Sequence, residues 1–129
     1  MRVLLDTSVL IAEQAPSDVE AAISVASLAE LHFGVLVASS EDERALRTQR
    51  LGAIESAFDP LPINDQVARE WGRLAAAVSN RGGQPRRRAI DLALAATATV
   101  HGVPLLTHNV GDFQIISDLV DARDPALGP

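Results

Sequence analysis

The chain has 129 residues, of which 47% are apolar but only 3% aromatic, and its formal net charge is −6. This length suits one domain with a single core of Leu, Val, Ile and Ala, and the apolar content argues against disorder. The chain contains no cysteine, which excludes a disulfide framework and thiolate ligation of zinc.

In the first half of the chain, short apolar runs alternate with helical patterns. Residues 2–6 predict a buried strand that ends at Asp6, and a helix capped by Thr7 or Ser8 should run to about Gln14. The elements expected next are a strand over residues 22–26, a helix over 28–38 with Ser27 as its cap, and an amphipathic helix over 41–58.

The second half of the chain continues this alternation, with residues 82–86 as its clearest loop. The expected elements are a short strand over residues 61–63, a helix over 64–81 capped by Asn64, a very apolar helix over 88–101 stopped by Gly102, a strand over 105–107, and residues 115–120 leading into a fifth strand.

Strands that alternate with helices predict an α/β domain with a parallel sheet of about five strands and helices on both faces. No repeat or linker divides the chain, so residues 1–129 should form one domain. Ligands of such sheets bind beyond the carboxyl ends of the strands. Asp6 and Thr107 end predicted strands at that edge.

Acidic residues interrupt every strongly apolar stretch of the chain. Asp6 breaks the apolar start too early for a secretory signal. Glu30 and Asp91 lie within the most apolar internal segments, so no run reaches the ~20 residues of a membrane helix. We therefore expect a cytoplasmic protein with no membrane association.

Four acidic residues, Asp6, Glu30, Asp91 and Asp112, stand at the edges of four separate apolar elements. If they converge, their carboxylates would form a site for a hard cation, since Mg²⁺ and Mn²⁺ prefer carboxylate and water oxygens. Such an ion makes a bound water more acidic and neutralises charge on a phosphate. The sequence is compatible with one ion or two.

Three of these acids also have a purely structural explanation. Asp6 could cap the helix that follows it. Ser27-x-x-Glu30 has the spacing of a capping box, in which the Glu turns back to the cap residue. Asp112 lies in a short loop segment where Asx turns are common.

Asp91 is the hardest acid to explain structurally, because a carboxylate in a helix of mostly apolar residues faces desolvation. A salt bridge to one residue of the run Arg86-Arg87-Arg88 is the structural alternative. The functional interpretation of the same run is contact with an RNA backbone beside Asp91, because arginine binds phosphate through a planar fork. Short basic runs are otherwise solvated surface.

The order and spacing of these segments resemble the PIN-domain nucleases, and most closely the VapC-type toxins of bacterial toxin–antitoxin pairs. The resemblance covers nearly the whole chain. It rests on the segments Val3-Leu4-Leu5-Asp6-Thr7-Ser8, Glu30-Leu31 with Gly34, Ala89-Ile90-Asp91-Leu92-Ala93, and Thr107-x-Asn109-x-x-Asp112-Phe113, of which the last is the most specific.

The resemblance implies a Mg²⁺- or Mn²⁺-dependent endoribonuclease that a cognate antitoxin protein keeps silent. It also favours a metal role for Glu30 over the capping box. The catalytic metal ligands are then Asp6, Glu30, Asp91 and Asp112. Thr7, Thr107 and Asn109 are the expected supporting residues, with Thr107 and Asn109 holding Asp112 or a metal-bound water in place, and Arg86, Arg87 and Arg88 remain the candidate RNA-binding run. A homodimer is expected, with residues 28–37 and 41–58 as candidate surfaces.

Two other functions stay open at this point. A PIN-like fold can serve as a noncatalytic RNA- or protein-binding module, although the loss of an acid that would accompany that role is not seen. A DNA-directed nuclease is the second alternative, since metal chemistry does not distinguish RNA from DNA. Receiver domains and haloacid-dehalogenase-type phosphatases are excluded because both need a Lys, which the chain lacks.

Overall fold

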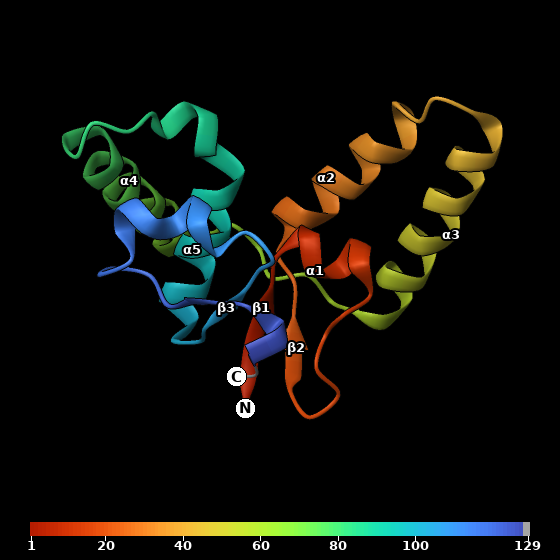
Figure 1. Ribbon diagram of the computed structural model, residues 1–129, viewed down its shortest axis with the longest axis horizontal. Coiled ribbons are helices and arrows are strands. Elements are labelled where there is room, and N and C mark those ends of the chain that lie inside the picture. Colours follow the sequence, from red (N-terminus) through yellow and green to blue (C-terminus); the bar gives the residue numbers. More distant parts are fainter. Residues whose placement is uncertain (128–129) are drawn as a thin grey trace.

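A wholly parallel four-stranded sheet with strand order β2-β1-β3-β4 runs through the centre of the computed structural model, which describes residues 1–127 (Figure 1). Helices lie on both faces of this sheet. The strands are short: β1 is Arg2–Leu5, β2 is Glu20–Ala22, β3 is Leu105–Leu106 and β4 is Ala122–Arg123.

The helices form two groups, one on each side of the sheet (Figure 1). In the first group, α2 and α3 lie side by side as a hairpin above α1. The second group contains α4 and α5. The α-helices are α1 Thr7–Ala12, α2 Val25–Leu36, α3 Glu41–Ala57, α4 Asp65–Asn80 and α5 Ala89–His101, and the 3-10 turns are η1 Pro85–Arg88, η2 Val110–Ile116 and η3 Pro125–Leu127.

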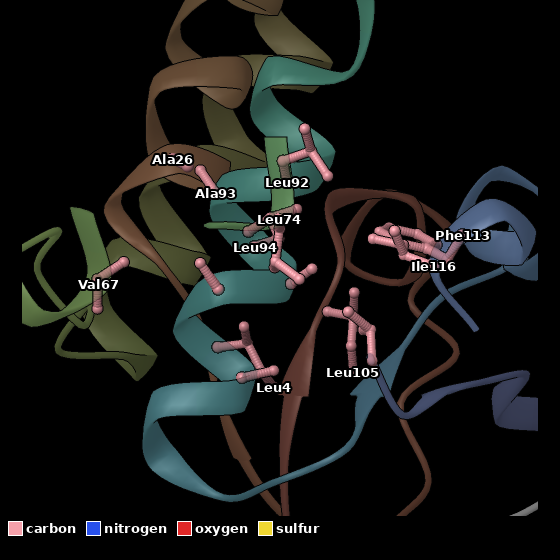
Figure 2. Close-up of a cluster of buried hydrophobic side chains, with 14 of the residues drawn as sticks. Leu4, Ala26, Val67, Leu74, Leu92, Ala93, Leu94, Leu105, Phe113 and Ile116 are labelled. Atoms are coloured by element: carbon pink, nitrogen blue, oxygen red, sulfur yellow. The ribbon is translucent and has the colours of Figure 1, made fainter. Parts of the chain in front are cut away.

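Alternating side chains of the strands divide the core between these two groups. Val3, Leu5 and Leu106 are buried with residues of α1, α2 and α3. Leu4 and Leu105 point to the opposite face, toward α5 and the residues of η2 (Figure 2). This is the period of two expected for strands covered on both faces.

The apolar character of α5 follows from its position in the core. Residues Leu92 to Ala98 are all buried between the sheet and α4. A helix that is apolar on all sides is stable only when it is covered on all sides. Asp91 lies one residue before this stretch, at the end of the helix where the cover stops.

The predicted fold class is confirmed: the chain forms an α/β domain with a parallel sheet and helices on both faces. The three long helices α3, α4 and α5 lie within a residue or two of their predicted bounds. Among residues 1–127 no helix is long and apolar enough to cross a membrane.

The described sheet has four strands rather than about five. The strand predicted over residues 61–63 is reduced to one parallel bridge between Leu61 and Ser24. Leu61 donates its N–H to the Ile23 carbonyl and accepts from the Val25 N–H, and the ladder stops there because the partner segment becomes helix α2 at Val25. Residues 115 and 116 end η2, residues 117–119 form a turn, and the strand into which they lead, β4, begins at Ala122.

The capping box predicted at Ser27 is wrong. The second strand ends at Ala22, earlier than predicted, and Ser24 caps α2 by accepting a hydrogen bond from the Ala26 N–H at 3.0 Å. Ser27 therefore lies within the helix and is fully buried. Because Ser27 is not the cap, Glu30 does not form a capping box with it and can contact another residue.

Candidate active site

The pairing of β1 with β3 brings Asp6 and Thr107 together. Leu5 is in register with Leu106, so the next residue of each strand lies at the same carboxyl edge of the sheet. The Asp6 N–H donates to the Leu106 carbonyl at 2.9 Å. In the strand order β2-β1-β3-β4, the next strand in the chain, β2, lies on one side of β1, and β3 lies on the other. The carboxyl ends of β1 and β3 therefore form the topological switch point of the sheet, where ligands of such folds bind.

The buried carboxylate of Asp6 is held by two hydroxyl groups. Its Oδ2 accepts hydrogen bonds from Ser8 Oγ and Thr107 Oγ1, both at 2.7 Å, and the residue is only 6% exposed. Thr107 Oγ1 also accepts from the Asn109 N–H at 3.0 Å, and Ser8 Oγ accepts from the His108 N–H at 3.2 Å. The network fixes the loop after β3 against the start of α1.

Asp6 occupies the N-cap position of α1, but its side chain makes no capping hydrogen bond. The structural explanation of this residue as a cap is therefore wrong. Its carboxylate is directed instead to Ser8 and Thr107. Both hydroxyl groups donate to this carboxylate and so fix its orientation at the end of β1.

Glu30 reaches this site through Thr7. The Thr7 hydroxyl is hydrogen-bonded to Glu30 Oε1 and to Ser27 Oγ, the latter at 3.0 Å. Thr7 directly follows Asp6, so α1 links the two acids through adjacent residues. Glu30 is exposed on α2, whereas Ser27 and Thr7 are buried. It stands at the border of the site rather than in its centre.

Asp91 and Asp112 share one arginine. Arg88 Nη1 lies 3.0 Å from Asp112 Oδ1 and 3.5 Å from Asp91 Oδ2. The guanidinium group thus joins the start of α5 to η2. The salt bridge that was the structural alternative for Asp91 exists, but the same arginine also holds the second acid.

The electrostatics of Asp91 connect these acids to Asp6. Burial raises the pKa of the Asp91 carboxyl, and the negative charges of Asp6 and Asp112 raise it further, against the opposing effect of Arg88. The hydrogen bond to Asp112 raises the pKa of the Arg88 guanidinium. The charges of Asp6 and Asp112 therefore both act on Asp91, and Arg88 pairs with Asp91 and Asp112.

The described structure groups the predicted site residues to different degrees. Asp6, Asp91 and Asp112 share one electrostatic environment, and Glu30 joins them through Thr7. As they stand in residues 1–127, no three acidic or histidine side chains form a metal-ligand cluster. Thr107 and Asn109 lie in the Asp6 network, whereas Asp112 is held by Arg88.

Sequence reasoning missed the roles of Ser8 and Ser27. Ser8 was considered only as a helix cap, although its position two residues after Asp6 allows it to reach that carboxylate. Ser27 was assigned to the N-cap, whereas it lies in the first turn of α2 and is hydrogen-bonded to Thr7. The run of three arginines also divides: Arg88 is paired with carboxylates, whereas Arg86 and Arg87 make no salt bridge within residues 1–127.

A cavity of about 530 Å³ borders the site next to Asp112. Arg87 and Arg88 line it from η1, Gly83 and Gln84 from the preceding turn, and Gly111 and Asp112 from η2. An anionic ligand in this cavity would have two arginines and the Asp112 carboxylate around it. The arrangement suits a phosphodiester chain that approaches a bound cation.

Comparison with known proteins identifies the family. The description "PIN domain" belongs to the family profile that matches residues 3–118. The chain belongs to this family. It is 37% identical to Ribonuclease VapC5 of Mycobacterium tuberculosis (strain ATCC 25618 / H37Rv) over 115 residues, which cover 82% of each protein. Ribonuclease VapC4 of the same strain is 33% identical over 125 residues, covering 92% of this chain and 93% of that protein.

Solved structures agree with this assignment. A chain of the crystal structure of VapBC-5 from Mycobacterium tuberculosis, a member of the VapBC family of toxin–antitoxin systems, matches with a TM-score of 0.81 and 34% identity over 95% of this chain and 96% of that one. VapBC-1 from nontypeable Haemophilus influenzae has a TM-score of 0.75 at 24% identity, over 98% and 99% of the two chains, which shows a common fold. The predicted resemblance to VapC-type PIN domains is confirmed.

Proposed function

We propose that this PIN-domain protein is a metal-dependent endoribonuclease and the toxin of a toxin–antitoxin pair. The observation that supports the proposal is that the charges of Asp6 and Asp112 both act on Asp91, with Asp6 at the switch point of the sheet. The relatives named as ribonucleases supply the substrate class.

We assign Asp6, Asp91 and Asp112 as metal ligands and Glu30 as a fourth, with Mg²⁺ or Mn²⁺ as the ion. Carboxylate oxygens are the ligands these ions prefer, and the excess negative charge that raises the pKa of Asp91 is what a cation would relieve. When bound, the ion would supply positive charge beside the phosphodiester and make water more acidic.

The remaining residues of the site position these carboxylates. Ser8 and Thr107 hold the Asp6 carboxylate in place, Asn109 orients Thr107, and Thr7 holds Glu30. Arg88 lowers the repulsion between Asp91 and Asp112, and its guanidinium group could also donate to a phosphate oxygen. Such positioning gives a reacting phosphate a fixed approach.

Arg86 and Arg87 are proposed to bind the RNA backbone beside this site. Within residues 1–127 neither makes a salt bridge, and Arg87 lines the cavity that contains Asp112. A guanidinium group without a carboxylate partner keeps its donors for phosphate oxygens. This supports contact with RNA over a merely solvated surface for Arg87.

We propose that the protein binds an antitoxin and that it forms a homodimer. The α2–α3 hairpin exposes apolar side chains that its own core does not use. Phe33 is 65% exposed and Leu36 76%, and Val37 and Leu46 of the same hairpin are also exposed. An antitoxin that covers the site should present Arg or Lys to the carboxylates, because a cation there satisfies their charges.

The decisive experiment is incubation of the purified protein with total RNA, with Mg²⁺, with Mn²⁺ and with excess chelator, followed by mapping of the cut ends. Cleavage at defined positions that stops in chelator and in Asp6→Asn is the expected result. RNA that is bound but never cut would support the noncatalytic module instead. Equal cleavage of single-stranded DNA of the same sequence would support the DNA-directed alternative.

A further inference from the structure

Arginines without an acidic partner are rare in the described structure. Eight of the eleven arginines lie within 3.9 Å of a carboxylate oxygen. Within residues 1–127 the exceptions are Arg50, Arg86 and Arg87. In a chain with 17 acids, an arginine that avoids all of them is better placed for an external anion. The η1 arginines belong to the site already described, which leaves Arg50.

Arg50 lines a cavity of about 270 Å³ in the seam between α2 and α3. On α3 the lining residues Glu43, Arg47 and Arg50 are spaced i, i+4 and i+7, so they share one face of that helix. They oppose Glu30 and Gly34 of α2, which are one turn apart. Figure 1 shows the two helices side by side.

Arg47 and Arg50 differ in what holds them, although they line the same cavity. Arg47 donates from Nε to Glu43 Oε1 at 2.9 Å and from Nη1 to the Gly34 carbonyl at 2.6 Å. Its donors are thus used to join α3 to α2. Arg50 has no salt bridge or side-chain hydrogen bond within residues 1–127 and is half-buried. Its guanidinium is the one in this seam that a ligand can engage.

Glu30 connects the seam to the active site. Its side chain lines the cavity with Arg50 and is hydrogen-bonded to Thr7, the neighbour of Asp6. On the opposite flank, Arg87 lines the cavity that contains Asp112. Each flank of the carboxylate group therefore carries an arginine without an acidic partner, in a cavity that shares one acid with the site.

We propose that Arg50 binds a backbone phosphate of single-stranded RNA on the α2–α3 flank, while the scissile phosphate lies at the carboxylates and Arg87 holds the η1 flank. The inference rests on the proposed ribonuclease function and names the second anchor of its substrate. Two anchors fix the register of a flexible strand, whereas one leaves it free to swing. Arg50 acts as a positioning residue.

The first test measures binding of a short fluorescent single-stranded RNA in the Asp6→Asn background, where the strand stays intact. Arg50→Gln should weaken binding about tenfold, and the salt dependence of log K should become shallower by ~0.7, the value for one phosphate contact on a single strand. Arg50→Lys should restore part of the affinity. The matched control is Arg44→Gln, which changes an exposed arginine of the same helix already paired with Glu41.

The second test locates the phosphate. In wild type, a neutral methylphosphonate linkage should weaken binding at one position on each side of the cut. In Arg50→Gln, the methylphosphonate at one of these positions should no longer weaken RNA binding. In Arg87→Gln, the same should hold for the other position. Cleavage by Arg50→Gln in the otherwise native protein should show a raised KM with kcat nearly unchanged.

Several outcomes would overturn the inference. Arg50→Gln that binds RNA as tightly as Arg44→Gln excludes the contact, and so does a loss of affinity that leaves both methylphosphonate positions sensitive. Loss of binding to an acidic antitoxin with RNA affinity intact would assign Arg50 to the protein partner. If wild type binds RNA without cutting it, the nuclease proposal fails while the Arg50 result still holds.

Discussion

The carboxyl group of Asp91 is affected both by its burial and by the charges of two other carboxylates. These effects raise its pKa, burial being the largest cause, followed by the charge of Asp6 and then that of Asp112. An acid whose pKa is higher in the folded than in the unfolded state opposes folding once it is ionised. The site thus stores repulsion that a cation can release.

The first prediction concerns pH. Between the ordinary pKa of an aspartate and the raised pKa of Asp91, the folded protein holds more protons than the unfolded chain, so the free energy of unfolding falls as pH rises through this window. Asp91→Asn should flatten this decline. Urea unfolding of both proteins in chelator, from pH 3.5 upward, measures it. Parallel stability curves for the two proteins would contradict it.

The second prediction concerns divalent ions. Mg²⁺ or Mn²⁺ should raise the thermal midpoint of wild type, because a ligand of the folded state stabilises by ~2.7 kcal/mol at a hundred times its Kd. Asp6→Asn and Asp91→Asn should lose both this shift and RNA cleavage, while circular dichroism shows an intact fold. Their loss of activity should exceed the ~100-fold typical of a residue that only orients a ligand. Full cleavage by either variant would refute the assigned ligands.

The third prediction concerns Thr107. Thr107→Val removes a hydroxyl that donates to Asp6 and accepts from the Asn109 N–H, in a fully buried position. We expect a loss of ~1–3 kcal/mol in urea unfolding, because buried polar groups lose their partner. Thr99→Val is the control, since the Thr99 hydroxyl reaches only the Ala95 carbonyl on an exposed part of α5. Equal effects of the two would show that the Asp6 network is not stabilising.

The sequence anticipates some residues of the site better than others for a physical reason. Asp6 and Thr107 follow directly from strand ends, because parallel neighbours bring their carboxyl ends to one edge. Glu30 was ambiguous, since the spacing Ser-x-x-Glu does not tell which serine begins the helix. Here Ser24 begins it, and Ser27 turns to Thr7. Contacts between side chains of different elements, such as that of Arg88 with Asp112, cannot be predicted from the spacing of neighbouring residues in the sequence.

At the scale of elements, the turn before η1 determines the position of Arg87 and Arg88. Gly83 packs so tightly that a Cβ there would lie 2.7 Å from Val78 Cγ1, 2.9 Å from Ile115 Cδ1 and 3.2 Å from the Val78 carbonyl. Val78 is buried in α4 and Ile115 belongs to η2. The contact therefore ties η1 to both elements and sets where Arg87 and Arg88 stand.

The fourth prediction tests this packing. Gly83→Ala should destabilise the protein by ~1–3 kcal/mol, the usual cost of overpacking, and weaken RNA cleavage by displacing η1. Gly72→Ala is the matched control: it lies in α4 with no atom within 4 Å of the added Cβ, so it should be neutral or stabilising by up to ~1 kcal/mol. Chemical unfolding and cleavage assays on both variants decide the matter. A Gly83→Ala protein as stable and active as Gly72→Ala would rule the constraint out.

The elements differ in how far the sequence predicts them. The long helices α3 and α4 begin at Ser40 and Asn64, whose side chains cap them, and such signals are local. The strands have two to four residues, too few for a clear alternation. β4 is Ala122–Arg123 and exists only because β3 pairs with it. Short strands depend on tertiary pairing that composition does not record.

At the scale of the whole molecule, the exposed apolar residues of the α2–α3 hairpin call for a partner. The fifth prediction is that the protein encoded immediately upstream copurifies with this chain and abolishes its growth inhibition. Leu36→Glu should weaken that complex without lowering the thermal midpoint, since Leu36 is 76% exposed. Separate elution of the two proteins, with growth inhibition unchanged, would remove the toxin assignment even if RNA cleavage is confirmed.

The bond between Thr107 and Asp6 spans 101 residues and has a consequence for synthesis. β1 can pair with β2 soon after both leave the ribosome, but its other neighbour, β3, is made near the end of the chain. Until residue 107 has emerged from the exit tunnel, Asp6 lacks its hydroxyl partner, and Asp112, which follows it in the chain, cannot yet join the site. A nascent chain therefore has no assembled site, and under the proposed function it is harmless to the message that encodes it until the segment with Thr107 and Asp112 has emerged.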